Sequence, residues 1–124
     1  MRQLNNRLQL NFRLLFVYRV LCDKKLQKIY LDEIAVVESL KDYIRIITSS
    51  SKYIIHRTLS SFTEELPTDK FIRIHRSFTI AIDKVDIVEG NSLEINGIRY
   101  TIGRSYLSET KDKILNRVKK SSNL

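Results

Sequence analysis

The chain has 124 residues, 43% of them hydrophobic, so it is long enough for one domain to bury a core and too apolar for a disordered tail. Lysine and arginine number 22 against 14 acidic residues, and the formal net charge of +8 indicates a polyanionic partner: nucleic acid, anionic lipid or an acidic protein. No stretch reaches the roughly 18 apolar residues of a membrane span, so membrane insertion is not expected. The lone cysteine, Cys22, cannot form an internal disulfide, which favours a reducing, cytoplasmic location.

Composition shifts divide the chain into three segments. Residues 1–13 are polar and basic without a clear period, and we interpret them as an N-terminal segment or a linker from an upstream domain. Residues 14–118 carry the periodic patterns of a folded domain. Residues 119–124, Lys-Lys-Ser-Ser-Asn-Leu, are expected to form a frayed C-terminal tail.

Strand patterns dominate the first half of the domain. Apolar runs rich in β-branched and aromatic side chains predict strands at 14–20, 26–31, 34–38, 43–48 and 53–55. The run from Ile34 to Val37 is apolar without interruption, as expected for a strand that is buried on both faces. Between the last two strands, the serines from Ser49 to Ser51 predict a hairpin loop.

A short helix is predicted at 58–66, where the period changes. Three apolar residues recur at helical spacing: Leu59, Phe62 and Leu66. Ser61 and Glu64 have the spacing of a capping box, and Pro67 ends the run.

The second half returns to strands before it ends in a helix. Strands are predicted at 71–74, 79–82, 85–88, 93–95 and 98–100. Asn96-Gly97, between the last two, predicts a type I′ hairpin turn. After Gly103 the period predicts a terminal helix with Ser105 as its candidate N-cap. The fold is therefore mainly β, with about nine or ten short strands, one short internal helix and one C-terminal helix.

The chain lacks the usual signatures of an enzyme. The two histidines, His56 and His75, stand 19 residues apart, and neither has a neighbouring ligand at metal-binding spacing. No serine lies in a nucleophile elbow, and no glycine-rich loop could hold a phosphate group. We therefore expect neither catalysis nor a metal or cofactor.

The stretch from Phe71 to Phe78 is the most informative part of the chain. It gathers Arg73, His75 and Arg76 within four residues, interleaved with apolar side chains and without an acidic neighbour. Period-2 alternation turns the apolar side chains inward and the hydrogen-bond donors outward, where they can meet phosphate oxygens or base edges. Together with two other turns, this stretch supplies six candidate DNA-binding residues: Lys41, Tyr43, Arg73, Arg76, Ser77 and Arg104.

Three motifs in this order resemble the LytTR-type DNA-binding domain of bacterial response regulators. The first is Ile34 to Tyr43, with the sequence Ile-Ala-Val-Val-Glu-Ser-Leu-Lys-Asp-Tyr. The second is Phe71 to Phe78 around His75-Arg76-Ser77, and the third is Ile102-Gly103-Arg104-Ser105-Tyr106. The similarity covers roughly residues 16–118, so residues 14–118 are taken as the LytTR-like domain.

The resemblance implies both an architecture and a function. Members of the family have elongated antiparallel β-sheets with small helices, insert loop residues into successive major grooves, bend the DNA and regulate transcription. In this chain the resemblance implies the following roles: one reading loop with Lys41 and Tyr43, a central one with Arg76 and Ser77, Arg73 on the DNA backbone beside it, and Arg104 in the neighbouring groove. His75 is expected to be a partly buried residue that bonds a turn. Ala81, where many members have asparagine, is expected to be structural.

The resemblance also implies partners: double-stranded promoter DNA with direct repeats, two copies of the protein on that DNA, and an upstream receiver domain that this chain does not contain. Two other readings stay open. A non-catalytic, basic β-rich module could dock on an acidic protein or an anionic membrane through its charge alone. An RNA-binding β-module would stack bases on exposed aromatic side chains, for which the chain offers Tyr53, Tyr100 and Tyr106.

Overall fold

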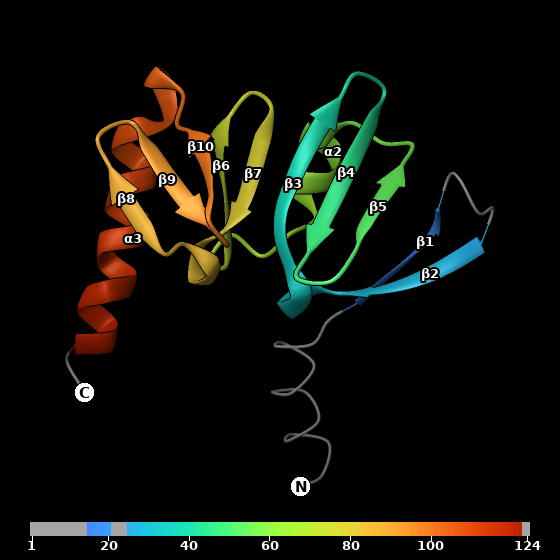
Figure 1. Ribbon diagram of the computed structural model, residues 1–124, viewed down its shortest axis with the longest axis horizontal. Coiled ribbons are helices and arrows are strands. Elements are labelled where there is room, and N and C mark those ends of the chain that lie inside the picture. Colours follow the sequence, from blue (N-terminus) through green and yellow to red (C-terminus); the bar gives the residue numbers. More distant parts are fainter. Residues whose placement is uncertain (1–14, 21–24, 123–124) are drawn as a thin grey trace, which may run out of the picture.

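The computed structural model of the chain describes residues 15–20 and 25–122, with side chains described from 26 to 116 (Figure 1). Its strands are β1 (Leu15–Val20), β2 (Lys25–Tyr30), β3 (Ile34–Leu40), β4 (Tyr43–Thr48), β5 (Lys52–Ile55), β6 (Phe71–His75), β7 (Phe78–Ala81), β8 (Ile87–Glu89), β9 (Ser92–Ile95) and β10 (Ile98–Thr101). The helices are α2 (Leu59–Glu64) and α3 (Leu107–Ser122), and 3-10 turns are η1 (Leu31–Glu33), η2 (Ile82–Lys84) and η3 (Arg104–Tyr106). The predicted mainly β fold is confirmed, although β7 and β8 are displaced by one or two residues from their expected positions. The N-terminal segment 1–13 and Cys22 lie outside the described residues.

The strands form three antiparallel sheets. A five-stranded sheet has the order β5-β4-β3-β7-β6, a three-stranded sheet the order β10-β9-β8, and β1 and β2 form a hairpin. Figure 1 shows these sheets spread along the long axis of the molecule, with α3 beside the three-stranded sheet at one side and the β1–β2 hairpin beyond β5 at the other. The domain is therefore elongated, as the family resemblance implied.

Strand β3 is the centre of the structure, and the prediction that it is buried on both faces is confirmed. Its residues Ile34 and Val37 pack in one apolar cluster with α2, while Ala35 and Val36 pack in a second cluster with the three-stranded sheet. All four are at most 2% exposed. The pairing of β3 with β4 shifts register between Ile34 and Val36, which lets neighbouring residues turn to the same face.

Helix α2 begins one turn before the capping box that the sequence predicts. Thr58 is the N-cap, since its backbone is extended and its side chain accepts a hydrogen bond from Ser61 N. Ser61 therefore lies within the first turn, and its expected role as the cap is wrong. Starting the helix at Leu59 buries Leu59 and Phe62 on its inner face, and this burial decides where the helix begins.

The entry to α3 also differs from the prediction. Ser105 lies inside η3, a 3-10 turn that leads directly into the helix, so it is not the N-cap of α3. The β9–β10 turn, in contrast, is as predicted: Asn96 and Gly97 have φ values of 53° and 80°, and a type I′ turn requires positive φ at both positions. No helix in the described part of the chain is both long and apolar enough to cross a membrane.

Replacing Phe62 with alanine tests whether α2 and the five-stranded sheet share one core. Phe62 is fully buried, so Phe62→Ala should lower the free energy of unfolding by about 3–5 kcal/mol, measured by urea denaturation. Glu64→Ala on the exposed side of the same helix is the control and should change it by less than about 0.5 kcal/mol. Equal losses in the two variants would contradict the packing of α2 described above.

Candidate nucleic-acid interface

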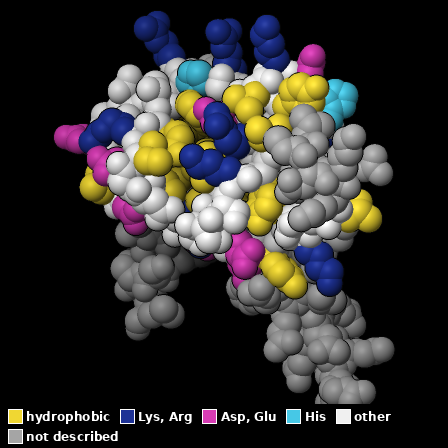
Figure 2. Space-filling view, turned by 45° about the vertical axis from the view of Figure 1, so that its right-hand side comes forward, with side chains coloured by type: hydrophobic (Ala, Val, Ile, Leu, Met, Phe, Trp, Pro, Cys, Tyr) yellow, Lys and Arg dark blue, Asp and Glu magenta, His cyan; other side chains and the backbone are white. Residues whose placement is uncertain are grey.

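Three turn segments that carry the candidate residues lie at the same end of the molecule. Lys41 and Asp42 connect β3 to β4, Arg76 and Ser77 connect β6 to β7, and Gly103–Arg104 follows β10. Figure 1 shows these segments together at its upper end, and Figure 2 shows Lys and Arg side chains projecting from that end. We call this surface, formed by residues 41–43, 76–77 and 103–104, the basic end.

Backbone hydrogen bonds fasten the three segments to one another. Ser39 N, at the end of β3, donates to Ser77 O at 2.9 Å, and Gly103 N donates to Ile74 O at 2.7 Å. A Cβ atom at position 103 would lie 3.0 Å from the ring of Tyr106, so glycine suits this close approach. Backbone hydrogen bonds thus fix the positions of the three turns of the basic end relative to one another.

The arginines in the described part of the chain differ sharply in their partners. Three form ion pairs, with N–O distances of 3.1, 3.0 and 2.6 Å: Arg45 with Glu38, Arg57 with Glu65, and Arg99 with Glu94. Arg73 donates its hydrogen bonds to backbone and hydroxyl oxygens of its own chain. Among the described arginine side chains only Arg76 and Arg104 bind no other described group, and both are exposed. Their guanidinium groups remain available to a partner.

Lys41 occupies an unfavourable backbone conformation at the tip of the β3–β4 turn. Its φ is +65°, in the left-handed region where a side chain is disfavoured and glycine is the usual residue. Lys41 is exposed, so no packing of its side chain offsets this cost. Such strain often marks a functional position, and here it presents an ammonium group beyond the ends of the strands.

Tyr43 has a neighbour that sequence reasoning did not select. The Tyr43 ring is 37% exposed and lies 5.1 Å, centroid to centroid, from the ring of His56, which follows β5 and is also exposed. Strand pairing of Ile44 with Ile55 brings the two rings together. His56 therefore extends the basic end toward β5, and only the strand register, not a local motif, could have indicated it.

His75 and Ser77 shape the β6–β7 turn. His75 is partly buried, and its Nδ1 accepts a hydrogen bond from Ser77 N at 3.0 Å, which confirms its expected role in bonding a turn. The His75 ring packs 5.3 Å from Phe78, and Phe78 packs edge-on against Tyr100 at 5.2 Å. This row of rings connects the turn to β10 of the three-stranded sheet.

Burial raises the pKa of Tyr100 above its ordinary value. The nearby Glu38 carboxylate adds to this effect while Arg45 opposes it, so the phenol is neutral at physiological pH.

The three tyrosines that an RNA-stacking surface would use are packed into the fold. Tyr100 is only 8% exposed. Tyr53 packs partly buried against the cluster around α2, and Tyr106 packs against the cluster that includes the three-stranded sheet. They form no exposed row of stacking platforms, which weighs against the RNA-binding reading.

Comparison with known proteins identifies the family. The family model described as the LytTr DNA-binding domain matches residues 24–115. The chain belongs to the LytTR DNA-binding domain family. A sensory transduction protein LytT of Enterococcus faecalis is 30% identical over 96 residues, which cover 70% of this chain and 40% of that protein. This LytTR domain thus spans less than half of the length of that curated relative.

A solved structure supports the same fold. The LytTr DNA-binding domain of a protein described as a methyl-accepting/DNA response regulator from Bacillus cereus matches with a TM-score of 0.70 and 18% identity. The match covers 81% of this chain and 95% of that one. Ala81, expected from the sequence to be structural, is 6% exposed and packs in the cluster with α2. Its expected structural role is confirmed.

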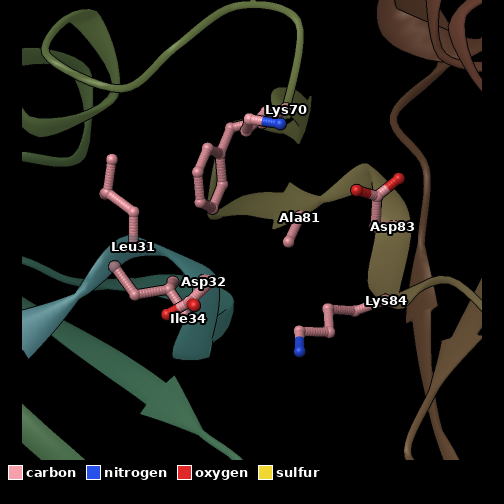
Figure 3. A pocket seen from close by; sticks show the side chains of 8 residues that line it. Leu31, Asp32, Ile34, Lys70, Ala81, Asp83 and Lys84 are labelled. Atoms are coloured by element: carbon pink, nitrogen blue, oxygen red, sulfur yellow. The ribbon is translucent and has the colours of Figure 1, made fainter. Parts of the chain in front are cut away.

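The opposite end of this LytTR domain has a different character. A hollow of about 230 Å³ lies where β3 and β6 begin and β7 ends (Figure 3). Its lining combines apolar side chains with two lysines and two aspartates: Lys70, Lys84, Asp32 and Asp83. Acidic and basic side chains are equal in number there, whereas at the basic end Asp42 is the one acid beside Lys41, Arg76 and Arg104. Within the described residues, no group of three or more His, Cys, Asp or Glu side chains could hold a metal ion.

The strain at Lys41 can be measured. Lys41→Gly should raise the free energy of unfolding by about 1 kcal/mol, because glycine adopts positive φ without a steric penalty. Lys52→Gly, the same change at an exposed position in β5, should lower it by about 0.5–1 kcal/mol. If both glycine variants were destabilised equally in thermal or urea unfolding, the turn would not hold Lys41 in a strained conformation.

Proposed function

We propose that this LytTR domain binds double-stranded DNA sequence-specifically, with the turns of its basic end in successive major grooves, and thereby regulates transcription in the cytoplasm. The observation that carries the proposal is the gathering of Lys41, Arg76 and Arg104 at one end, each exposed and without a carboxylate partner among the described residues. Family membership supports DNA as the partner. The groove assignment rests on the protruding turns.

The chemistry of the basic end suits a division of labour. The guanidinium groups of Arg76 and Arg104 can each meet the O6 and N7 atoms of guanine with two parallel hydrogen bonds. Lys41 offers a point charge to phosphate, and the Ser77 hydroxyl can donate to phosphate or a base edge. The exposed edge of Tyr43, supported by His56, can contact the sugar or base surface beside Lys41. The proposal therefore assigns base reading to Arg76 and Arg104.

The wider context of the protein belongs to the same proposal. We take the domain to be the effector part of a two-component response regulator, with a receiver domain upstream, because its LytT relative is described as a sensory transduction protein. Two copies would bind direct repeats in promoter DNA. The alternative is that the same cationic surface docks on an acidic protein or an anionic membrane without reading sequence.

Salt dependence separates these possibilities. From a random pool of duplexes, the domain should select one sequence family and hold it near physiological salt. If the interface contains about six to ten phosphate contacts, affinity should fall by ~10³ to 10⁵ between 50 and 200 mM salt. Gel shifts over this range, with selected and scrambled duplexes, provide the measurement. Uniform, weak retention of every duplex would contradict sequence-specific binding and favour the docking module.

Alanine substitutions test the two proposed reading residues. Arg76→Ala and Arg104→Ala should each weaken binding to the selected duplex by about 1–3 kcal/mol and relax preference at one base pair. The control is Lys84→Ala at the opposite end, which removes the same charge and should change binding much less. Affinities on duplexes with every single base-pair change give the readout. Equal losses on selected and scrambled DNA for Arg76→Ala would exclude it as a reading residue.

A further inference from the structure

Arg73 holds the β6–β7 turn from within. It lies in β6, three residues before Arg76 at the start of the turn, and its side chain is partly buried. Its Nε donates to His75 O at 2.8 Å, and its Nη2 donates to Arg76 O at 2.6 Å. Its Nη1 donates to the Ser60 hydroxyl on α2 at 3.2 Å. One guanidinium group therefore binds two consecutive carbonyl groups of the turn and connects them to the helix behind it.

The turn needs such support because the strand ladder is irregular there. The pairing of β6 with β7 shifts register between Arg73 and His75, and pairing resumes only at His75 with Phe78. A shift of this kind leaves backbone groups without ladder partners. A charged donor forms stronger hydrogen bonds with carbonyl oxygens than a neutral one, and the planar fork of arginine can reach several acceptors at fixed geometry. Arg73 thus donates hydrogen bonds to backbone carbonyl groups at the point where the pairing of β6 with β7 is interrupted.

We propose that Arg73 is a positioning residue that pre-orders the turn, so that Arg76 projects into the groove, and that it makes no phosphate contact of its own. The inference rests on the proposed DNA-binding function and departs from the backbone-contacting role that the family resemblance implied. A loop that is ordered before binding loses less conformational entropy on binding, which favours the specific complex. A phosphate contact, in contrast, would require Arg73 to give up hydrogen bonds that it already makes.

Arg73→Lys is the decisive variant, because lysine keeps the charge but cannot reach three acceptors at the geometry of the guanidinium fork. In the free protein, hydrogen exchange of the Ser77 amide, which donates to His75 Nδ1, should accelerate by about tenfold, the equivalent of one lost charged hydrogen bond. Amides of β4 should keep their protection and show that the domain is folded. Unchanged exchange at Ser77 would overturn the proposal.

DNA binding supplies the second readout. Arg73→Lys should lose about tenfold in affinity for the selected duplex, while its affinity for scrambled DNA and its salt slope stay at the wild-type values. If Arg73 contacted phosphate instead, Arg73→Lys would bind nearly as well as wild type. In that case Arg73→Ala would weaken both duplexes equally and reduce the salt slope by about one. That pattern overturns the inference and leaves the proposed function intact.

Two further measurements keep the outcomes distinct. Ser60→Ala removes one of the three acceptors of Arg73. It should accelerate exchange of the Ser77 amide and weaken binding to the selected duplex, each by a smaller factor than Arg73→Lys. Lys52→Ala, on β5 beside the β4–β5 turn, removes a charge away from the basic end and should leave both at wild-type values. If the wild-type domain selects no duplex at all, the proposed function fails. If it selects one and Arg73→Lys matches it in every respect, only the role of Arg73 fails.

Discussion

Hydrogen bonds along the end of β6 hold the basic end together, because they join segments that are far apart in the sequence. Ile74 O accepts a hydrogen bond from Gly103 N. In the turn that follows β6, Ser77 O accepts a hydrogen bond from Ser39 N. These contacts involve backbone atoms only, so apart from Gly103, which lies close to the Tyr106 ring, they do not depend on which side chains the turns carry. The exposed residues at the tips can therefore differ among related domains while the turns keep their mutual arrangement.

The sheets behind these turns make the arrangement rigid. Strand β3 is buried between α2 on one face and the three-stranded sheet on the other, and it ends at the first basic turn. The row of rings from His75 through Phe78 to Tyr100 extends this packing up to the central turn. The proposed DNA contacts need hydrogen-bond donors at fixed spacing. Each of the three turns follows a strand, β3, β6 or β10, that packs in one or both apolar clusters, and this packing fixes the position of the turn.

Sequence patterns predicted the features that depend on local periodicity. The doubly buried strand at Ile34–Val37 and the Asn96-Gly97 turn follow from apolar runs and turn chemistry. The cap of α2 was missed because Thr58 and Ser61 both offer a hydroxyl group, and burial of the helix decides between them. The alternation of β6 placed Arg73 on the outer face, but it could not show the register shift that turns two carbonyl groups toward its guanidinium group.

The net charge of +8 does not by itself say which surface of the protein is positive. That depends on which basic side chains are paired with acidic ones. Arg45 and Arg99 lie opposite glutamates on neighbouring strands, so their charges are largely cancelled where they stand. Lysines and aspartates meet in the hollow at the far end. At the basic end no described carboxylate forms an ion pair with Arg76 or Arg104. A protein with evenly spread charge would meet a polyanion in many orientations, whereas unpaired cations at one end favour a single orientation from the first encounter. Local neutralisation elsewhere is therefore as important for directed binding as the exposed arginines themselves.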